Sequence, residues 1–119
     1  MTQQRDIAAS IARIWRGRVA REKADEYQTY LMATGIKSLQ STALAVEALR
    51  EDRDTETEFM VISHWESVEA MQRFAGAEAR RIHHLPKDEQ YLLELPKAVQ
   101  VLNILPLPAV AEVQGDGNA

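Results

Sequence analysis

The stretch EFMVISHW, residues 58–65, decides the fold. Phe59 and Val61 alternate with Met60 and Ile62, and this period of two is typical of a β-strand. Both alternating sets are apolar, so the strand has two faces that avoid water. An apolar sheet face left open would exceed the patch that soluble monomers usually expose. The segment therefore predicts a sheet that is covered on both sides.

Three further strands are predicted on either side of this one. Residues 42–50 (TALAVEALR) contain good helix formers, but the acidic turn EDRDTE that follows indicates a hairpin with residues 58–65, so we interpret them as a strand. Residues 10–19 (SIARIWRGRV) and residues 99–105 also alternate and complete the set.

Two helices are predicted between the strands. Apolar residues spaced by three and four predict the first helix over residues 21–34, with Gly35 at its C-terminal stop. The second begins after Ser67, a good N-cap, and its apolar stripe runs to Ile82 with a kink or split near Gly76. The stripe is Val68, Met71, Ala75, Ala79 and Ile82. A short helical turn is expected over residues 87–93, after Pro86.

The element order β-α-β-β-α-β predicts an α+β fold of ferredoxin-like type with a four-stranded antiparallel sheet. Right-handed crossovers place both helices on one face of that sheet. We expect a second copy of the chain to cover the other face, which makes a homodimer. The predicted domain covers residues 10–105, with terminal extensions at 1–9 and 106–119.

Composition narrows the class of protein. The chain has 119 residues, no cysteine and a net charge of −4. The lack of cysteine excludes disulfides and thiolate chemistry, and the negative charge disfavours a nucleic-acid partner. No apolar run is long enough to span a membrane, and the polar residues 1–10 do not form a secretion signal. We therefore expect a cytoplasmic protein with no membrane or nucleic-acid partner.

Several segments together resemble the antibiotic biosynthesis monooxygenase family of the dimeric α+β barrel superfamily. The likeness covers roughly residues 10–105. One departure is SLQS at residues 38–41, where many relatives carry a Pro-Gly turn. The segments that carry the likeness are Ile11 to Gly17, Tyr30, Thr34-Gly35, Phe59 to Ser67, Glu69-Ala70, Phe74-Ala75-Gly76, Pro86-Lys87-Asp88 and Leu92-Leu93-Glu94.

The resemblance implies a dimer whose subunits each hold a pocket between sheet and helices. Some relatives oxidise polycyclic aromatic substrates with molecular oxygen and no cofactor, and others degrade haem. Haem-degrading relatives carry a helix histidine ten residues after a tryptophan, and an asparagine on the first strand. Here His84 follows Phe74 by ten residues and the first strand has no asparagine. We therefore do not expect haem degradation, while haem binding by His84 stays open.

A cofactor-free oxygenase needs a base, an oxyanion partner and apolar walls. His84 or His64 is the candidate base, because the pKa of histidine lies near neutrality. Arg13 is the candidate oxyanion partner. Adjacent histidines on a helix point about 100° apart, so His83 and His84 do not form a metal site by themselves. No metal and no cofactor is expected, and the candidate pocket residues are Trp15, Tyr27, Trp65, Phe74 and His83.

Each candidate also has a structural interpretation. His64 on a strand can be a hydrogen-bonded structural residue, His83 and His84 can be surface residues, and Trp15 and Trp65 can belong to the core or a dimer interface. The leading hypothesis is a cofactor-independent monooxygenase acting on a small aromatic or quinol-like substrate. The alternatives are a non-catalytic dimer that binds a small molecule and a purely structural module.

Overall fold

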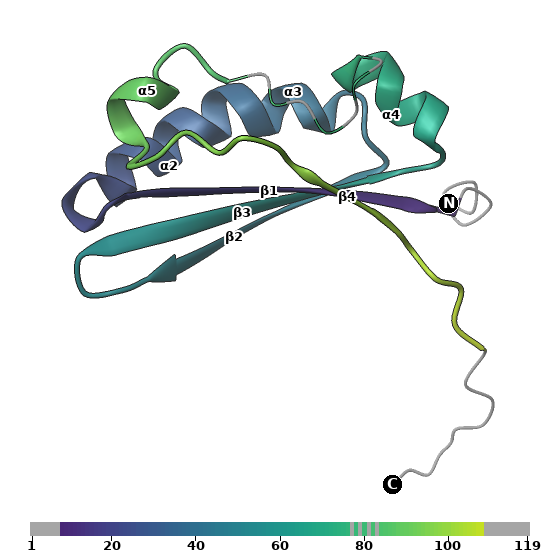
Figure 1. Cartoon of the computed structure of the whole chain (residues 1–119), viewed down its shortest axis with the longest axis horizontal. Coiled ribbons are helices and arrows are strands. Elements are labelled where there is room, and N and C mark those ends of the chain that lie inside the picture. The colour runs from purple at the N-terminus through teal and green to yellow at the C-terminus, as the bar shows by residue number, and fades with distance from the viewer. Residues whose placement is uncertain (1–7, 77, 79, 81, 83, 109–119) are drawn as a thin grey trace, which may run out of the picture.

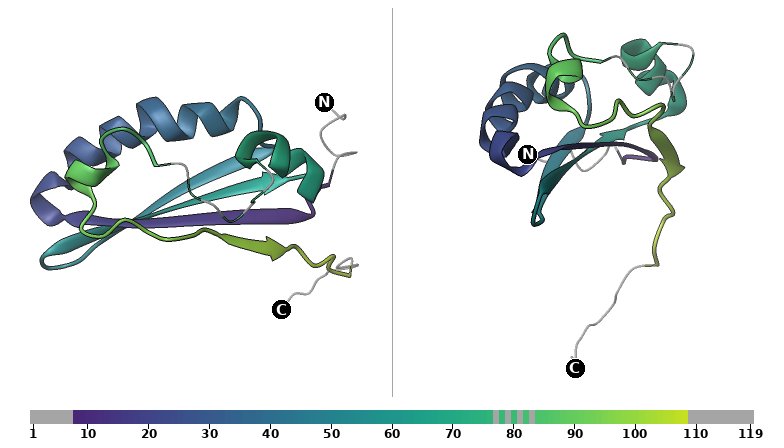
Figure 2. Two further views of the ribbon diagram at one scale, coloured as in Figure 1. Left: turned by 45° about the horizontal axis from the view of Figure 1, so that its top comes forward. Right: turned by 60° about the vertical axis from the view of Figure 1, so that its left-hand side comes forward.

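The computed structural model describes residues 8–76, 78, 80, 82 and 84–108. Its four strands form one antiparallel sheet in the order β2-β3-β1-β4. The helices all lie on one side of this sheet, as Figure 1 and Figure 2 show from three directions. The fold is thus the predicted α+β, ferredoxin-like one. The strands are β1 (Ile11–Ala20), β2 (Ala45–Asp52), β3 (Glu56–Trp65) and β4 (Gln100–Asn103).

The sheet is built on the long central pair β1 and β3. Their register runs from Ile11 opposite Trp65 to Ala20 opposite Glu56. β4 pairs only with the first part of β1, residues 11–14. β2 starts three residues later and ends two residues later than the predicted strand 42–50, at Ala45–Asp52. Residues 42–44 lie in the turn before it.

The first helical segment is longer than predicted. It continues from Arg21 through Gly35 to Gln40, so the predicted end at Thr34 is wrong. A glycine stops a helix when it takes a positive φ, and among the described glycines only Gly76 does so. The continuation buries two more apolar side chains, Ile36 and Leu39. The segment comprises η1 (Arg21–Lys23), α2 (Ala24–Leu31), the π-type turn η2 (Met32–Ile36) and α3 (Lys37–Gln40).

The second long helix is shorter than predicted. α4 spans Val68–Ala75, and the Ser67 hydroxyl caps it by accepting a hydrogen bond from the Ala70 N–H at 3.1 Å. Gly76 ends it, with a φ of 89°. This conformation suits glycine and does not continue a helix. The predicted extension to Ile82 is therefore wrong.

Residues between α4 and β4 follow an irregular path in the part that the structure describes. Ile82 is not helical there, and Ala79 lies outside the described residues. The short turn expected near residues 87–93 is present as α5 (Asp88–Tyr91). β4 is shorter than predicted, at Gln100–Asn103. Of the predicted terminal extensions, residues 1–7 and 109–119 lie outside the described residues.

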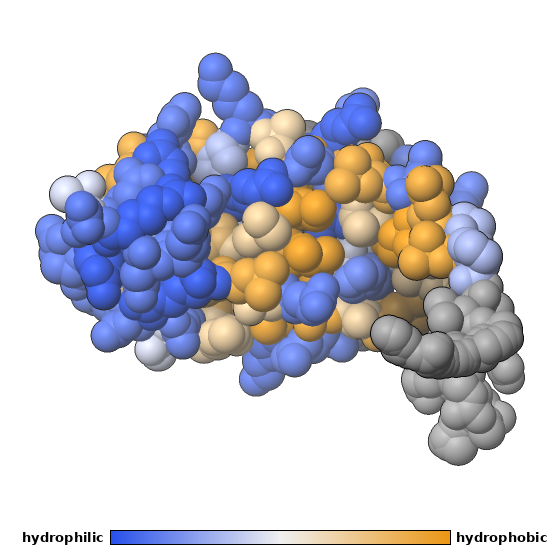
Figure 3. Space-filling model, turned by 90° about the horizontal axis from the view of Figure 1, so that it is seen from below, coloured by the Kyte–Doolittle hydropathy of each residue, from blue (hydrophilic) through white to orange (hydrophobic). Residues whose placement is uncertain are grey.

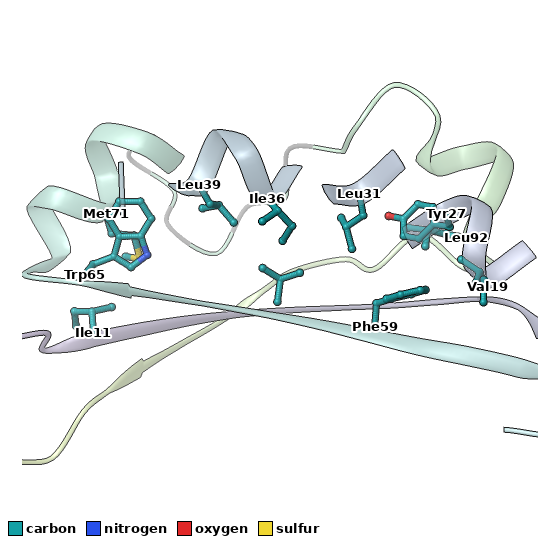
Figure 4. Packing of buried hydrophobic residues seen from close by; sticks show 12 residues of the cluster. Ile11, Val19, Tyr27, Leu31, Ile36, Leu39, Phe59, Trp65, Met71 and Leu92 are labelled. Carbon is teal, nitrogen blue, oxygen red and sulfur yellow. The ribbon is translucent and has the colours of Figure 1, made fainter. Parts of the chain in front are cut away.

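The core fills the space between the helices and the inner face of the sheet. Figure 4 shows it as a row along the strands, with Trp65 and Met71 at one end and Tyr27 and Phe59 at the other. Leu31 and the side chains added by the longer helix lie between these ends. The two ends of the core therefore carry different aromatic side chains.

The outer face of the sheet has no cover within the described part of the chain. Leu49 is 49% exposed and Leu102 44% exposed, and Ile14, Met60 and Ile62 are half-buried between them. Figure 3 shows apolar side chains over the middle of this face, next to a hydrophilic end. The predicted pattern of two apolar faces is present. The second copy expected to cover the outer one stays a prediction.

Candidate functional site

A cavity of about 290 Å³ lies between the inner face of the sheet and the helices. Its walls come from β1, β3, the long first helical segment, α4 and the chain that leads into α5 and β4. Most of its described lining is apolar, and of the described lining residues two carry a formal charge, Arg13 and Asp88. The lining residues are Arg13, Trp15, Leu31, Gly35, Ile36, Ser38, Leu39, Val61, Phe74, Ile82, Leu85, Asp88 and Val99.

Arg13 brings a positive charge into the cavity wall. It points from β1 to the helix side of the sheet and is only 8% exposed. Its guanidinium lies over the Phe74 ring of α4, 5.8 Å from the ring centre. Burial lowers the pKa of Arg13 below its ordinary value, but guanidinium remains charged at any physiological pH. A buried guanidinium against an aromatic ring can bind an anionic oxygen with defined geometry.

Trp15 forms part of the cavity floor because Gly17 leaves room for its ring. A Cβ at Gly17 would lie 2.4 Å from Cη2 of Trp15 and 2.7 Å from Cζ2. Both residues are on the inner face of β1, two positions apart. The indole therefore lies over the glycine backbone, and no side chain larger than hydrogen fits beneath it. Gly35 opens the cavity in a similar way on the helix side, where Leu85 comes within 3.3 Å of the Cβ position.

Asp88 is a site residue that sequence reasoning did not select. Its side chain is 2% exposed and lines the cavity. The Tyr27 hydroxyl donates to Oδ1 at 2.8 Å, and the Leu85 N–H donates to Oδ2 at 3.0 Å. Burial first, and then the Asp88 carboxylate, raise the pKa of Tyr27 above its ordinary value, so this hydroxyl keeps its proton. The one sequence signal was Asp88 in the segment Pro86-Lys87-Asp88.

Two predicted pocket residues lie behind the cavity wall. Trp65 does not line the cavity; it packs against Phe74 with ring centres 5.5 Å apart, and its Nε1–H donates to the Ser63 hydroxyl at 2.9 Å. Tyr27 packs against Phe59 at 5.5 Å and reaches the cavity only through Asp88. Among the predicted wall residues that the structure describes, Trp15 and Phe74 are those that line the cavity.

The histidines are not gathered at the cavity. His64 lies on the outer face of β3, next to Glu47 with Nε2 and Oε1 3.4 Å apart, so the sheet separates it from Arg13. His84 is exposed and is not a lining residue, although Ile82 and Leu85 on either side of it are. His83 lies outside the described residues.

The described residues form neither a metal cluster nor a membrane-spanning helix. No group of three or more histidine, cysteine, aspartate or glutamate side chains is arranged to hold a metal ion within the described part of the chain. No helix formed by the residues that the structure describes is both long enough and apolar enough to cross a membrane.

Comparisons with known proteins agree with this architecture. A Bacillus cereus crystal structure, of a proposed antibiotic biosynthesis monooxygenase, matches with a TM-score of 0.58 and 14% identity, over 86% of this chain and 99% of that one. At this identity the likeness shows the fold. No curated protein matches the chain. The family model described as antibiotic biosynthesis monooxygenase matches residues 10–84, more than half of the sequence. The chain therefore belongs to the antibiotic biosynthesis monooxygenase family.

Proposed function

We propose that the protein is a cofactor-independent monooxygenase that oxidises a small aromatic, quinol-like substrate in this cavity. The observation that carries the proposal is the cavity of about 290 Å³ with apolar walls and the buried guanidinium of Arg13. Family membership supports the same reaction type. Ligand cavities commonly measure roughly 300–1,000 Å³, so this one suits one small molecule of a few rings.

The proposed reaction needs no electron donor besides the substrate. A base removes the proton of a ring hydroxyl, and the resulting oxyanion reacts with dioxygen at a ring carbon. One oxygen atom stays on that carbon as a carbonyl, and the other leaves as water with two hydrogens of the substrate. Arg13 stabilises the negative charge on the substrate oxygen. The walls exclude water, which strengthens that electrostatic contact.

His84 is the proposed base. It lies between two lining residues, Ile82 and Leu85, whereas His64 faces the other side of the sheet. Replacing a general base typically lowers the rate by about 10²–10⁴-fold. We expect His84→Ala to lower oxygen uptake in this range and His64→Ala to have a smaller effect. Equal losses in the two variants would contradict the assignment.

Oxygen uptake with a series of hydroquinones and naphthols tests the function. We expect uptake by the native chain and a loss of about 10²-fold in Arg13→Gln, the size seen when an oxyanion donor is removed. The matched control is Arg16→Gln, because Arg16 is on the same strand but exposed on the outer face. No uptake with any member of the series, or equal uptake in both variants, would refute the proposal.

The second candidate function is non-catalytic binding of a small molecule. It is favoured by the position of the histidines, since neither described histidine lines the cavity. This function predicts ligands that raise the melting temperature without oxygen consumption. Binding to the folded state alone stabilises it by mass action, so weak ligands are visible at high concentration.

Both functions are proposed for a homodimer that forms through the outer sheet face. A second copy is the proposed cover because the patch contains Leu49, Met60, Ile62 and Leu102, and Figure 3 shows apolar side chains over the middle of this face. A twofold contact lets one surface cover itself. The cavity lies on the other side of the sheet, so the dimer leaves it accessible.

A further inference from the structure

The two charged residues of the cavity contact different parts of the core. The guanidinium of Arg13 is directed to Phe74, which packs on Trp65 opposite the start of β1. Asp88 is fixed to Tyr27, whose ring packs on Phe59 opposite Gly17. Gly17 follows Arg13 by four residues, which is about 13 Å along an extended strand. Figure 4 shows the contact residues Trp65 and Tyr27 toward opposite ends of the core.

Both charged groups are fixed before a ligand arrives. Each is more than nine-tenths buried, and each contacts side chains that belong to the core. Asp88 accepts hydrogen bonds from Tyr27 and Leu85, one on each carboxylate oxygen. A carboxylate has about four acceptor positions, so it can take a further donor from the cavity side. A hydrogen bond from a ligand contributes more binding free energy when the charged group that receives it is buried than when it is exposed.

We propose that the cavity selects an elongated aromatic ligand with an anionic oxygen at one end and a hydroxyl at the other, so that Arg13 binds the anion and Asp88 accepts the hydroxyl. This selectivity rests on one part of the proposed function, namely that the cavity is the ligand site. The rest of the lining is largely apolar and fits the rings between the two ends. Asp88 acts here as a specificity-determining residue and takes no part in bond making.

The same geometry excludes other ligands. A second anionic group at the far end would face the Asp88 carboxylate in a low-dielectric wall, and like charges repel strongly there. A methoxy group in place of the hydroxyl has no proton to donate and leaves the buried carboxylate without its new partner. The cavity should therefore discriminate among ligands of nearly equal shape.

Calorimetric titration of the whole chain with three two-ring probes tests this directly. The probes are 6-hydroxy-2-naphthoate, 6-methoxy-2-naphthoate and naphthalene-2,6-dicarboxylate. We expect the hydroxy acid to bind about tenfold or more tightly than each of the others, as one hydrogen bond to a charged group allows. Equal binding of the three, or preference for the dicarboxylate, would overturn the proposal, and Asp88 would then only fasten α5 to α2.

Variants test whether Asp88 and Arg13 cause the difference in affinity among the three probes. Asp88→Asn is expected to remove the preference against the dicarboxylate, while the matched control Asp54→Asn, exposed in the hairpin, keeps it. Arg13→Gln is expected to weaken the binding of all three acids. If Asp88→Asn keeps the native ranking, the proposal is overturned. If it does not fold, the ranking by the native chain decides alone.

Oxygen uptake on the same preparations separates this inference from the proposed function. Selective binding without uptake of oxygen by any hydroquinone would refute the monooxygenase and leave the two-ended site standing. Uptake of oxygen together with equal binding of the three probes would refute the two-ended site alone.

Discussion

The two faces of the sheet come from the same strands, alternate residue by residue and both contain apolar residues, but only the inner face is covered by the described part of the chain. On β3, Phe59, Val61 and Trp65 turn inward and are covered by the helices of the same chain. Met60 and Ile62 turn outward and are only half-buried. The inner face also accepts buried polar groups, which a covering layer from the same chain can satisfy. The difference shows that the inner face forms the core and the cavity, whereas the described part of the chain leaves the outer face uncovered.

The largest expected effect is on the inner face, in Trp65→Ala. Trp65 is 1% exposed, packs on Phe74 and donates to the Ser63 hydroxyl. Replacing a buried tryptophan by alanine typically costs about 3–5 kcal/mol. We expect a loss of that size in the free energy of unfolding, measured by denaturant titration. The control is Leu102→Ala on the outer face, because the Leu102 side chain is exposed in the single chain and its removal should cost less. Equal losses would mean that the faces do not differ as described.

The outer face is tested by Ile62→Glu. A carboxylate at the centre of the proposed interface would be buried without a partner, so we expect the dissociation constant of the dimer to rise by about 100-fold or more. Light scattering after size-exclusion chromatography measures the mass. The control Gln40→Glu adds the same charge at an exposed site of α3. A native chain that is monomeric at every concentration would refute the interface.

A smaller effect is expected inside the cavity, in Gly17→Ala. The new methyl group would overlap the Trp15 ring, which lines the cavity and would have to move. Overpacking of this kind costs about 1–3 kcal/mol. We expect lower stability and loss of ligand binding. Gly35→Ala is the milder comparison, because its methyl group would meet the mobile end of Leu85 at 3.3 Å. A Gly17→Ala protein that binds ligands as the native chain does would contradict the role of the Trp15 ring.

The sequence predicted the elements that depend on local patterning. The alternation of residues 58–65 and the Ser67 cap predicted a strand and a helix start that the structure contains. The helix ends were predicted wrongly for one reason: Gly35 was expected to stop the first helix, and Gly76 was expected only to kink or split the second. The sequence does not show which glycine takes a positive φ, and Gly35 was expected to stop a helix although Gly76 is the one that does.

The site was predicted in part, again for a physical reason. Arg13, Trp15 and Phe74 were selected as chemically suitable residues, and all three line the cavity. His64 was selected for its titration range, which says nothing of the face it occupies; a strand period shifted by one residue reverses that face. Asp88 was missed because its place in the cavity wall depends on a hydrogen bond from Tyr27, which is 61 residues away in the sequence.

The smallest expected effect concerns the Tyr27–Asp88 pair at alkaline pH. The pKa of Tyr27 is raised in the folded chain, so above its ordinary value of 10.0 the unfolded chain loses a proton that the folded chain keeps. Fewer protons on the unfolded state mean that stability falls as pH rises, by about 1.4 kcal/mol per pH unit for one group. The pKa of Tyr91 is also raised, by its hydrogen bond to Glu26. Tyr91 is more exposed, so it should contribute less to the pH dependence of stability.

Tyr27→Phe isolates that contribution. The variant loses one hydrogen bond to a buried carboxylate, so its stability near neutral pH should fall by about 1–3 kcal/mol. Between pH 10 and 11 its stability should then decline less steeply than that of the native chain, because the group that titrates only on unfolding is gone. Urea unfolding at a series of pH values measures both. The control Tyr91→Phe should change the alkaline slope less, since solvent screens the pair at the surface. An unchanged slope in Tyr27→Phe would mean that burial and Asp88 do not keep the Tyr27 hydroxyl protonated in the folded chain.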